Sequence, residues 1–258
     1  MASDEAFAYR PRMRWLILAS FLLGLAGAAR AGETGCWFDN GAVVVPAAFG
    51  DIAGDFLIDP AQPTSELHVT SAETFGITGE TARGTLRLAG RRIAGLTVNI
   101  VDLAPLARPF PAGLVGVIGA DALAGHTLVV ETAPCRVWLD PPRPRGRGTP
   151  LRRIAGAWAV KAAISDGVRA RQGWFAVSTA AWPSRIAGAA LSRQPAPGSD
   201  PPVRLRALSL DGRLFENLPA AVIENAPAGL EGSIGMAVWS RFRVRLDLRR
   251  GALELTPR

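Results

Sequence analysis

The chain has 258 residues, of which 48% are hydrophobic, so it can bury the core of one large domain or of two domains of about 100 residues each. Its net charge is +7, but Lys161 is the only lysine, and the arginines are scattered apart from those in 143–148 and 241–250. We therefore expect no nucleic-acid-binding surface. His68 and His126 stand apart and no CxxC motif is present, so we expect neither a metal site nor a cofactor.

Residues 1–31 have the pattern of a secretory signal peptide. The basic stretch "RPRMRW" precedes the apolar stretch "LILASFLLGLAGA", and "ARA" provides a small-residue cleavage site that ends at Ala31. The apolar stretch is short for a membrane span, which needs about 20 residues. The sequence therefore predicts export to the periplasm or secretion. The alternative is that the signal is not cleaved and attaches the protein to a membrane.

Two cysteines, Cys36 and Cys135, lie beyond the predicted signal peptide. In an oxidising compartment an even number of cysteines favours disulfide formation, and one bridge would close a loop of about 100 residues. The alternative is a pair of buried, unpaired thiols. We predict the disulfide.

The predicted elements of residues 36–139 are mostly strands. Residues 42–59 and 85–102 each have the pattern strand, turn, strand, with β-forming residues interrupted by glycine-containing turns. A short helix is expected within 66–76 and another at 120–125, and two closing strands follow. A segment of this composition predicts a small β-barrel.

The chain then repeats this unit. Residues 140–150, "DPPRPRGRGTP", predict a solvated linker. Beyond it, residues 151–258 hold strand pairs at 158–178 and 203–224, and short helices within 185–191 and 236–241. Residues 112–139 align with 228–255 without a gap, and residues 54–67 align with 173–186. The sequence thus predicts two tandem lobes, 36–139 and 151–258.

Each repeat resembles a lobe of the retropepsin-like aspartic proteases, and the tandem resembles two-lobed proteases of the pepsin/retropepsin type. In that family a strand ends in Asp-Thr-Gly, and a hydrophobic-hydrophobic-Gly segment follows later in the lobe. The second segment is here Val117-Ile118-Gly119 in lobe one and Ser233-Ile234-Gly235 in lobe two. The resemblance runs from about residue 36 to the end. It implies an all-β fold of two β-barrel lobes with a cleft between them.

The Asp-Thr-Gly signature is altered in both lobes. Lobe one has Asp59, Pro60 and Ala61 at these positions, and lobe two has Ser178, Thr179 and Ala180. The family's mechanism needs two facing carboxyl groups, one as general base and one as acid. Asp59 alone supplies one. Pro60 has neither the hydroxyl nor the N–H that the family's threonine offers, and the alanines add a Cβ where glycine lets the backbone pass closely.

Two further departures concern the surroundings of this site. Only "ETARG" (80–84) separates "FGIT" from the next strand in lobe one, and the proline-rich 192–202 is a poor hairpin former in lobe two, so we expect no flap over a bound peptide. Asp121 is the nearest candidate for a second acid, but we interpret it as structural. Glu131 and Asp247 match the family's strand-terminal aspartate and should serve the closing hairpins.

Three functions remain open from the sequence. The first is a catalytically impaired pseudo-protease that binds a peptide or envelope partner in the inter-lobe cleft. The second is an active aspartic endopeptidase that uses Asp59 with a non-standard second group. The third is a structural envelope module whose cleft is closed by Trp182 and Pro183. The altered signature and the missing flaps favour the first, and whether the protein is an enzyme stays open.

Overall fold

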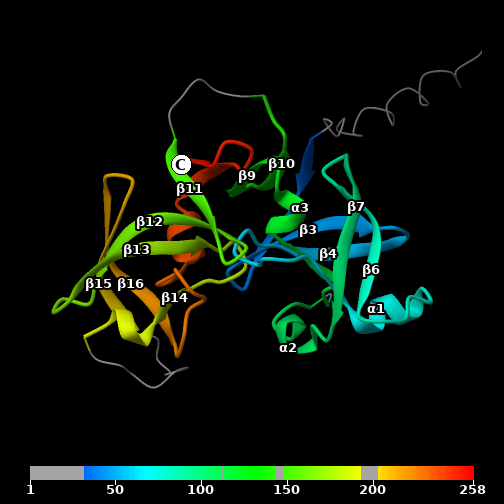
Figure 1. Cartoon of the computed structure of the whole chain (residues 1–258). Helices are drawn as coiled ribbons and strands as arrows, with labels where there is room; N and C mark the ends of the chain where they lie inside the picture. The colour runs from blue at the N-terminus through cyan, green and yellow to red at the C-terminus, as the bar shows by residue number, and fades with distance from the viewer. Residues whose placement is uncertain (1–31, 112, 143–147, 193–202) are drawn as a thin grey trace, which may run out of the picture. The chain divides into compact units, whose positions relative to one another are not determined.

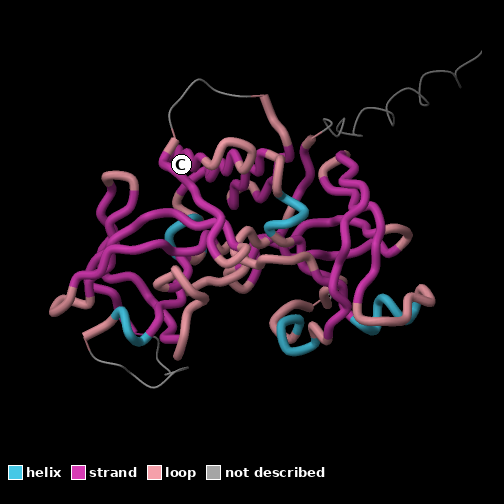
Figure 2. The backbone as a smooth tube through the Cα atoms, viewed as in Figure 1, coloured by secondary structure: helices cyan, strands magenta, loops and turns pink. Residues whose placement is uncertain are grey.

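A computed structural model describes residues 32–111, 113–142, 148–192 and 203–258. Strands dominate these ranges and the helices are short (Figure 1, Figure 2). The predicted signal peptide lies outside the described residues. No helix in the described ranges is both long enough and apolar enough to span a bilayer.

Lobe one contains a closed barrel of six strands. The strands pair in the order β3, β4, β8, β5, β7, β6, and β6 returns to β3. Alternate residues of β3, among them Val43, Val45 and Phe49, point into the barrel core. The bounds are β2 (Trp37–Asp39), which extends the barrel beside β3, β3 (Ala42–Phe49), β4 (Ile52–Ile58), β5 (Glu66–His68), β6 (Thr81–Leu88), β7 (Arg91–Val101) and β8 (Gly116–Ile118).

Lobe two repeats this barrel. Its strands pair in the order β12, β13, β17, β14, β16, β15, and β15 returns to β12. The prediction of two tandem barrels is therefore confirmed. The bounds are β12 (Ala157–Ser165), β13 (Ala170–Val177), β14 (Ser184–Ala187), β15 (Val203–Leu210), β16 (Arg213–Ile223) and β17 (Gly232–Ile234).

The closing hairpins of the two lobes leave their barrels and join one shared sheet. Its strand order is β1, β10, β9, β18, β19, β11, and the two lobes meet where β9 pairs with β18, with Val130 opposite Val244. Asp247 ends β18, and its Oδ1 accepts a hydrogen bond from Arg250 N at 3.2 Å, which closes the β18–β19 turn. The bounds are β1 (Glu33–Gly35), β9 (Thr127–Thr132), β10 (Cys135–Leu139), β11 (Thr149–Ile154), β18 (Phe242–Asp247) and β19 (Ala252–Pro257).

Short helices lie where the sequence predicts them. They are α1 (Val69–Thr74) and α3 (Ala120–Leu123) in lobe one, and the 3₁₀ turn η1 (Gly188–Ala190) and α4 (Met236–Trp239) in lobe two. One more helix, α2 (Ala104–Ala107), was not expected. Asp102 Oδ1 accepts a hydrogen bond from Ala104 N at 2.8 Å, which stabilises its first turn.

The segment between the lobes is partly built into the fold. Asp140 Oδ1 accepts a hydrogen bond from Thr127 N at 3.0 Å, and Asp140 Oδ2 lies 2.8 Å from His126 Nδ1. Strand β11 begins at Thr149, inside the range predicted as a solvated linker. Residues 143–147 lie outside the described ranges.

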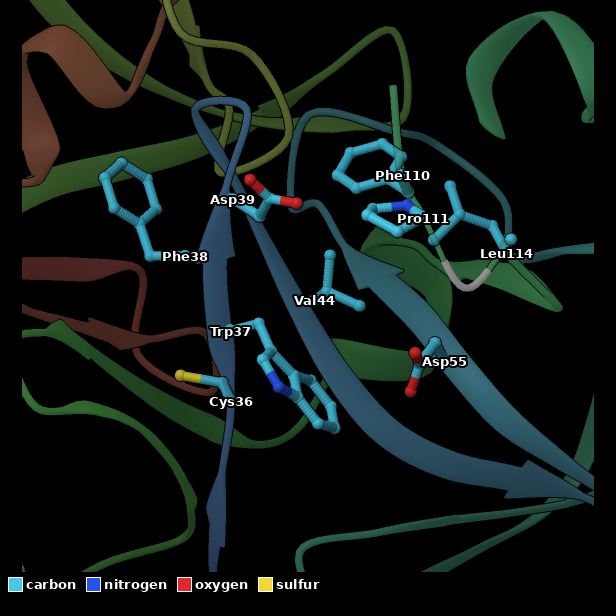
Figure 3. Close-up of a pocket in the computed structure, with 10 residues that line it drawn as sticks. Cys36, Trp37, Phe38, Asp39, Val44, Asp55, Phe110, Pro111 and Leu114 are labelled. Carbon is cyan, nitrogen blue, oxygen red and sulfur yellow. The ribbon is translucent and has the colours of Figure 1, made fainter. Parts of the chain in front are cut away.

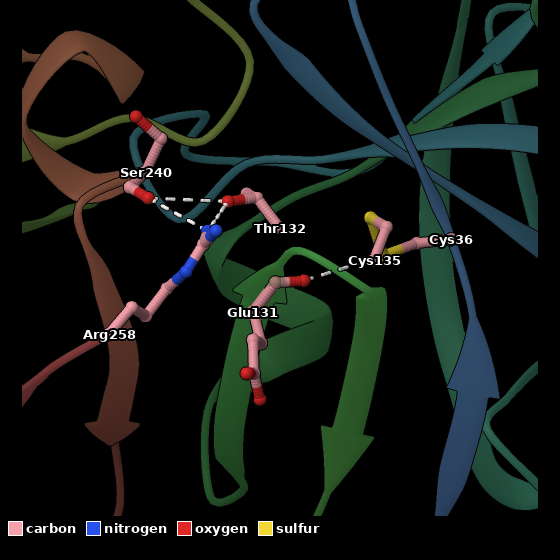
Figure 4. The surroundings of a disulfide bond; sticks show 6 residues. All are labelled: Cys36, Glu131, Thr132, Cys135, Ser240 and Arg258. Carbon is pink, nitrogen blue, oxygen red and sulfur yellow. Dashed lines mark hydrogen bonds between the residues drawn. A yellow bond between two sulfur atoms is a disulfide. The ribbon is translucent and has the colours of Figure 1, made fainter.

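The predicted disulfide is present. Cys36 and Cys135 are joined, with their Cα atoms 5.0 Å apart (Figure 4). Cys36 stands between β1, which belongs to the shared sheet, and β2, which pairs with β3 beside the lobe-one barrel. Because Cys135 is the first residue of β10, the bond holds the start of lobe one against the shared sheet.

Candidate functional site

The ends of β4 and β13 place Asp59 and Ser178 opposite each other. Each of these strands pairs in parallel with the strand that carries the hydrophobic-Gly segment of its lobe. Asp59 N donates to Ile118 O at 2.9 Å, and Ser178 N donates to Ile234 O at 3.0 Å. The two lobes therefore hold their turns by equivalent main-chain hydrogen bonds.

The Asp59 carboxylate accepts three hydrogen bonds. Ala61 N lies 3.0 Å from Oδ1, within the same turn. From lobe two, Thr179 N lies 3.1 Å from Oδ1, and Ser178 Oγ lies 3.2 Å from Oδ2. The two turns expected to face each other are thus in direct contact. Neither Ala61 nor Ala180 has a positive φ, so the alanines at the family's glycine positions are accommodated without left-handed backbone.

Main-chain bonds also cross between the lobes. Val43 N donates to Thr179 O at 2.8 Å, and Trp158 N donates to Pro60 O at 2.9 Å. These two bonds are equivalent, because Val43 and Trp158 occupy the same position on the first barrel strand of each lobe. In addition, the Thr179 hydroxyl donates to Ile58 O. Pro60 has no hydroxyl, so this last bond has no counterpart in the other direction.

Two buried serines support the hydrophobic-Gly segments. Ser65 Oγ accepts a hydrogen bond from Gly119 N at 3.0 Å, and Ser184 Oγ accepts one from Gly235 N at 3.1 Å. A Cβ on either glycine would lie under 3.0 Å from backbone atoms of the adjacent site loop, so glycine is required for this close approach. The serines occupy matching positions in the repeat, and this signal could have identified them in the sequence.

Asp121 forms no hydrogen bond with Asp59 among the described residues. Its carboxylate accepts hydrogen bonds from Ser65 N at 3.0 Å, from Ser65 Oγ at 2.7 Å and from Ala122 N at 2.7 Å. These contacts fix it within lobe one. Lobe two has Ala237 at the equivalent position.

Burial raises the pKa of Asp59 to about 6. The hydrogen bonds from Ala61, Thr179 and Ser178, and the positive charge of Arg185, oppose this rise without cancelling it. Within the described ranges, no hydrogen bond joins Asp59 to a second carboxyl group. Within the same ranges, no group of three or more His, Cys, Asp and Glu side chains could hold a metal ion.

The flap expected to be missing in lobe one is replaced by a helix. Strand β5 ends at His68 and β6 begins at Thr81, and α1 and a turn lie between them, with no strand pair. The corresponding part of lobe two falls mainly in 193–202, outside the described residues. Trp182, which the structural-module hypothesis places across the cleft, extends from the lobe-two turn onto Phe38, with ring centroids 6.2 Å apart, and is 44% exposed.

A cavity of about 630 Å³ lies in lobe one next to these turns (Figure 3). Val44 and Leu114 line it and are packed in one apolar cluster with Leu57, two residues before Asp59. Ala180, of the lobe-two turn, packs against the same cluster. Sequence reasoning missed this cavity because its lining comes from segments about 70 residues apart that carry no shared motif.

No model of a known protein family matches the sequence, and no curated protein matches it. Solved structures do match its fold. The crystal structure of an aspartic proteinase from Irpex lacteus has a TM-score of 0.52 at 13% sequence identity, over 88% of this chain and 97% of that one. The chain therefore has the two-barrel fold of an aspartic proteinase, with one aspartate where the two site turns meet.

Proposed function

We propose that the protein is a binding protein built on the aspartic-proteinase fold, which holds a peptide segment beside the two turns without cleaving it. The observation that carries this proposal is the contact between Asp59 and Ser178, a carboxylate facing a hydroxyl. Hydrolysis by this fold needs one carboxylate to activate water and a second, protonated carboxyl group to polarise the scissile carbonyl. Ser178 directs its proton toward Asp59 and is too weak an acid for the second role.

The remaining surroundings also favour binding over cleavage. A hairpin that closes over substrate excludes water and positions the scissile bond. Lobe one has α1 in that place. The lobe-one cavity, by contrast, has the size and the apolar lining of a ligand site. The disulfide supports action in an oxidising compartment, in line with the predicted export.

A second candidate is hydrolysis by Asp59 without a partner acid. The raised pKa of Asp59 favours it, because a carboxyl group with a pKa of about 6 is a better general base than an ordinary one.

One experiment separates the two. The purified protein and its Asp59→Asn variant are incubated with denatured casein from pH 3 to pH 7. We expect no cleavage by either protein. Cleavage by the wild type that disappears in Asp59→Asn would overturn the proposal in favour of the peptidase.

Binding is tested on a displayed peptide library. We expect a selected peptide to lose at least about tenfold in affinity in Phe110→Ala, because Phe110 lines the cavity. Phe75→Ala is the matched control, since Phe75 is 52% exposed in the same lobe and does not line the cavity. If no peptide is selected, the protein is not a peptide-binding protein.

A further inference from the structure

The lobe-one cavity has aromatic and aliphatic walls and a firmly held rim. Trp37, Phe110, Val44 and Leu114 form much of its lining. In Figure 3, Trp37 lies to one side of Val44 and Phe110 to the other. The rim is fixed because Asn40 Nδ2 donates to Pro109 O at 2.5 Å, joining the β2–β3 turn to the opposite wall. The disulfide holds Cys36, the residue before Trp37.

Two carboxylates, Asp39 and Asp55, enter this lining (Figure 3). Asp39 Oδ1 accepts a hydrogen bond from Asn40 N at 2.9 Å, which leaves Oδ2 available. Asp55 is tied through its backbone, since Val115 N donates to Asp55 O at 2.8 Å. Across 32–111, 113–142, 148–192 and 203–258, the Asp55 side chain accepts no hydrogen bond and forms no ion pair.

The chain has 29 basic and 22 acidic residues, so potential cationic partners are numerous. Elsewhere arginines pair with Glu33, Glu231, Asp211 and Asp140. The two cavity carboxylates are half-buried beside apolar side chains and have no such arginine among the described residues, so both can accept a cationic partner.

We infer that this cavity receives an arginine or lysine side chain of the bound peptide, an inference that rests on the proposed function. The alkyl stem of such a side chain can lie on Val44 and Leu114 while its charged head reaches Asp55. Asp39 lies on the other side of Val44 (Figure 3) and adds a longer-range attraction. The face of Trp37 adds a cation–π contact. A neutral side chain would leave both carboxylates without a counter-charge, and an acidic one would be repelled.

The shared apolar cluster connects this cavity with the turns. Leu114 and Val44 belong both to the cavity wall and to the cluster that contains Leu57 and contacts Ala180. A peptide whose basic side chain fills the cavity therefore has its neighbouring residues close to the Asp59 and Ser178 turns. The cavity gives the proposed peptide site a charge preference.

The test uses one selected peptide in four versions that differ at a single position: arginine, lysine, norleucine and glutamate. Affinities are measured by fluorescence anisotropy. Butylguanidinium and its neutral analogue butylurea are titrated separately by calorimetry. We expect the arginine and lysine peptides to bind at least about tenfold more tightly than the norleucine peptide, and butylguanidinium to bind where butylurea does not.

Asp55→Asn should remove most of this preference, and Asp51→Asn should not. Asp51 lies in the exposed turn of the same β3–β4 hairpin and does not line the cavity, so it is a matched change of charge. Trp37→Leu provides a second lining variant that should still fold, because Trp37 is 52% exposed. It should weaken the basic peptides more than the norleucine peptide.

The outcomes distinguish the inference from the function on which it rests. Equal binding of the norleucine or glutamate peptide, or an unchanged preference in Asp55→Asn, overturns the inference and leaves a peptide-binding protein. Binding of butylguanidinium without binding of any peptide supports the charge preference of the cavity and overturns the peptide function. Absence of binding in both arms overturns both.

Discussion

The turn that carries Asp59 and the turn that carries Ser178 have matching backbones, but one accepts hydrogen bonds that the other donates. Both are held by equivalent main-chain bonds, to Ile118 in lobe one and to Ile234 in lobe two. Beyond this symmetry, three hydrogen bonds run in one direction. Ser178 Oγ, Thr179 N and the Thr179 hydroxyl donate from lobe two, and Asp59 and the Ile58 carbonyl accept in lobe one. The two turns thus keep equivalent backbones although their side chains differ and bond in one direction only.

The largest effect that we expect comes from the bond that lobe one has and lobe two lacks. Replacing Cys36 and Cys135 by serine should lower the free energy of unfolding by about 4 kcal/mol, because the bond constrains a long loop in the unfolded chain. The cysteines are 99 residues apart. Urea denaturation measures the change, and the reduced wild type should show a similar loss. A loss below about 1 kcal/mol would mean that the bond constrains little in the unfolded chain.

The second prediction concerns Asp59, which accepts hydrogen bonds from lobe two. The pKa of Asp59 rises from 3.8 to about 6 on folding, so the folded state holds this proton more tightly. The resulting stability is complete below about pH 3.8 and is lost as the pH rises through about 6. Asp59→Asn carries no charge and should therefore be more stable than the wild type by about 3 kcal/mol at pH 7. Near pH 3.5 the two should be equal.

Urea denaturation from pH 3.5 to pH 8 measures this difference. Ser178→Ala is the informative comparison, because it removes a hydrogen bond that lowers the pKa of Asp59. Its stability should begin to fall near the same pH of about 3.8 as that of the wild type, and should continue to fall to a higher pH, because the folded-state pKa of Asp59 is higher in this variant. A constant difference between wild type and Asp59→Asn across this range would show that Asp59 titrates normally.

The smallest effect concerns Thr179, which donates hydrogen bonds from lobe two. Thr179→Val removes the hydroxyl that bonds Ile58 O and leaves a buried carbonyl without its donor, which should lower the free energy of unfolding by about 1–3 kcal/mol. Thr256→Val, at an exposed position on β19, is the control and should change little. Pro60→Thr would offer the missing reciprocal hydroxyl and should change stability by less than about 1 kcal/mol. Equal effects of Thr179→Val and its control would mean that the one-way bond contributes nothing.

The sequence predicts the repeated parts of this fold well, because two copies of one pattern reinforce each other. The barrels, the short helices after the site turns and the contact of Asp59 with Ser178 all lie within the repeat. The shared sheet could not be predicted, since the alternation of residues 127–139 fits a strand pair in a barrel as well as in a separate sheet. The cavity was also missed, because Trp37 and Phe110 belong to segments without periodic pattern.

The pairing of β9 with β18 has a consequence for any shortened form of the protein. Each strand contributes an equivalent position of the repeat, Val129 and Arg245, to an antiparallel pair. A lobe produced alone would expose that strand as an open edge, which a second copy could cover with the same pairing, giving a symmetric dimer. A dimer of that kind dissociates on dilution, whereas in the tandem chain the β9–β18 pairing is intramolecular and does not depend on concentration.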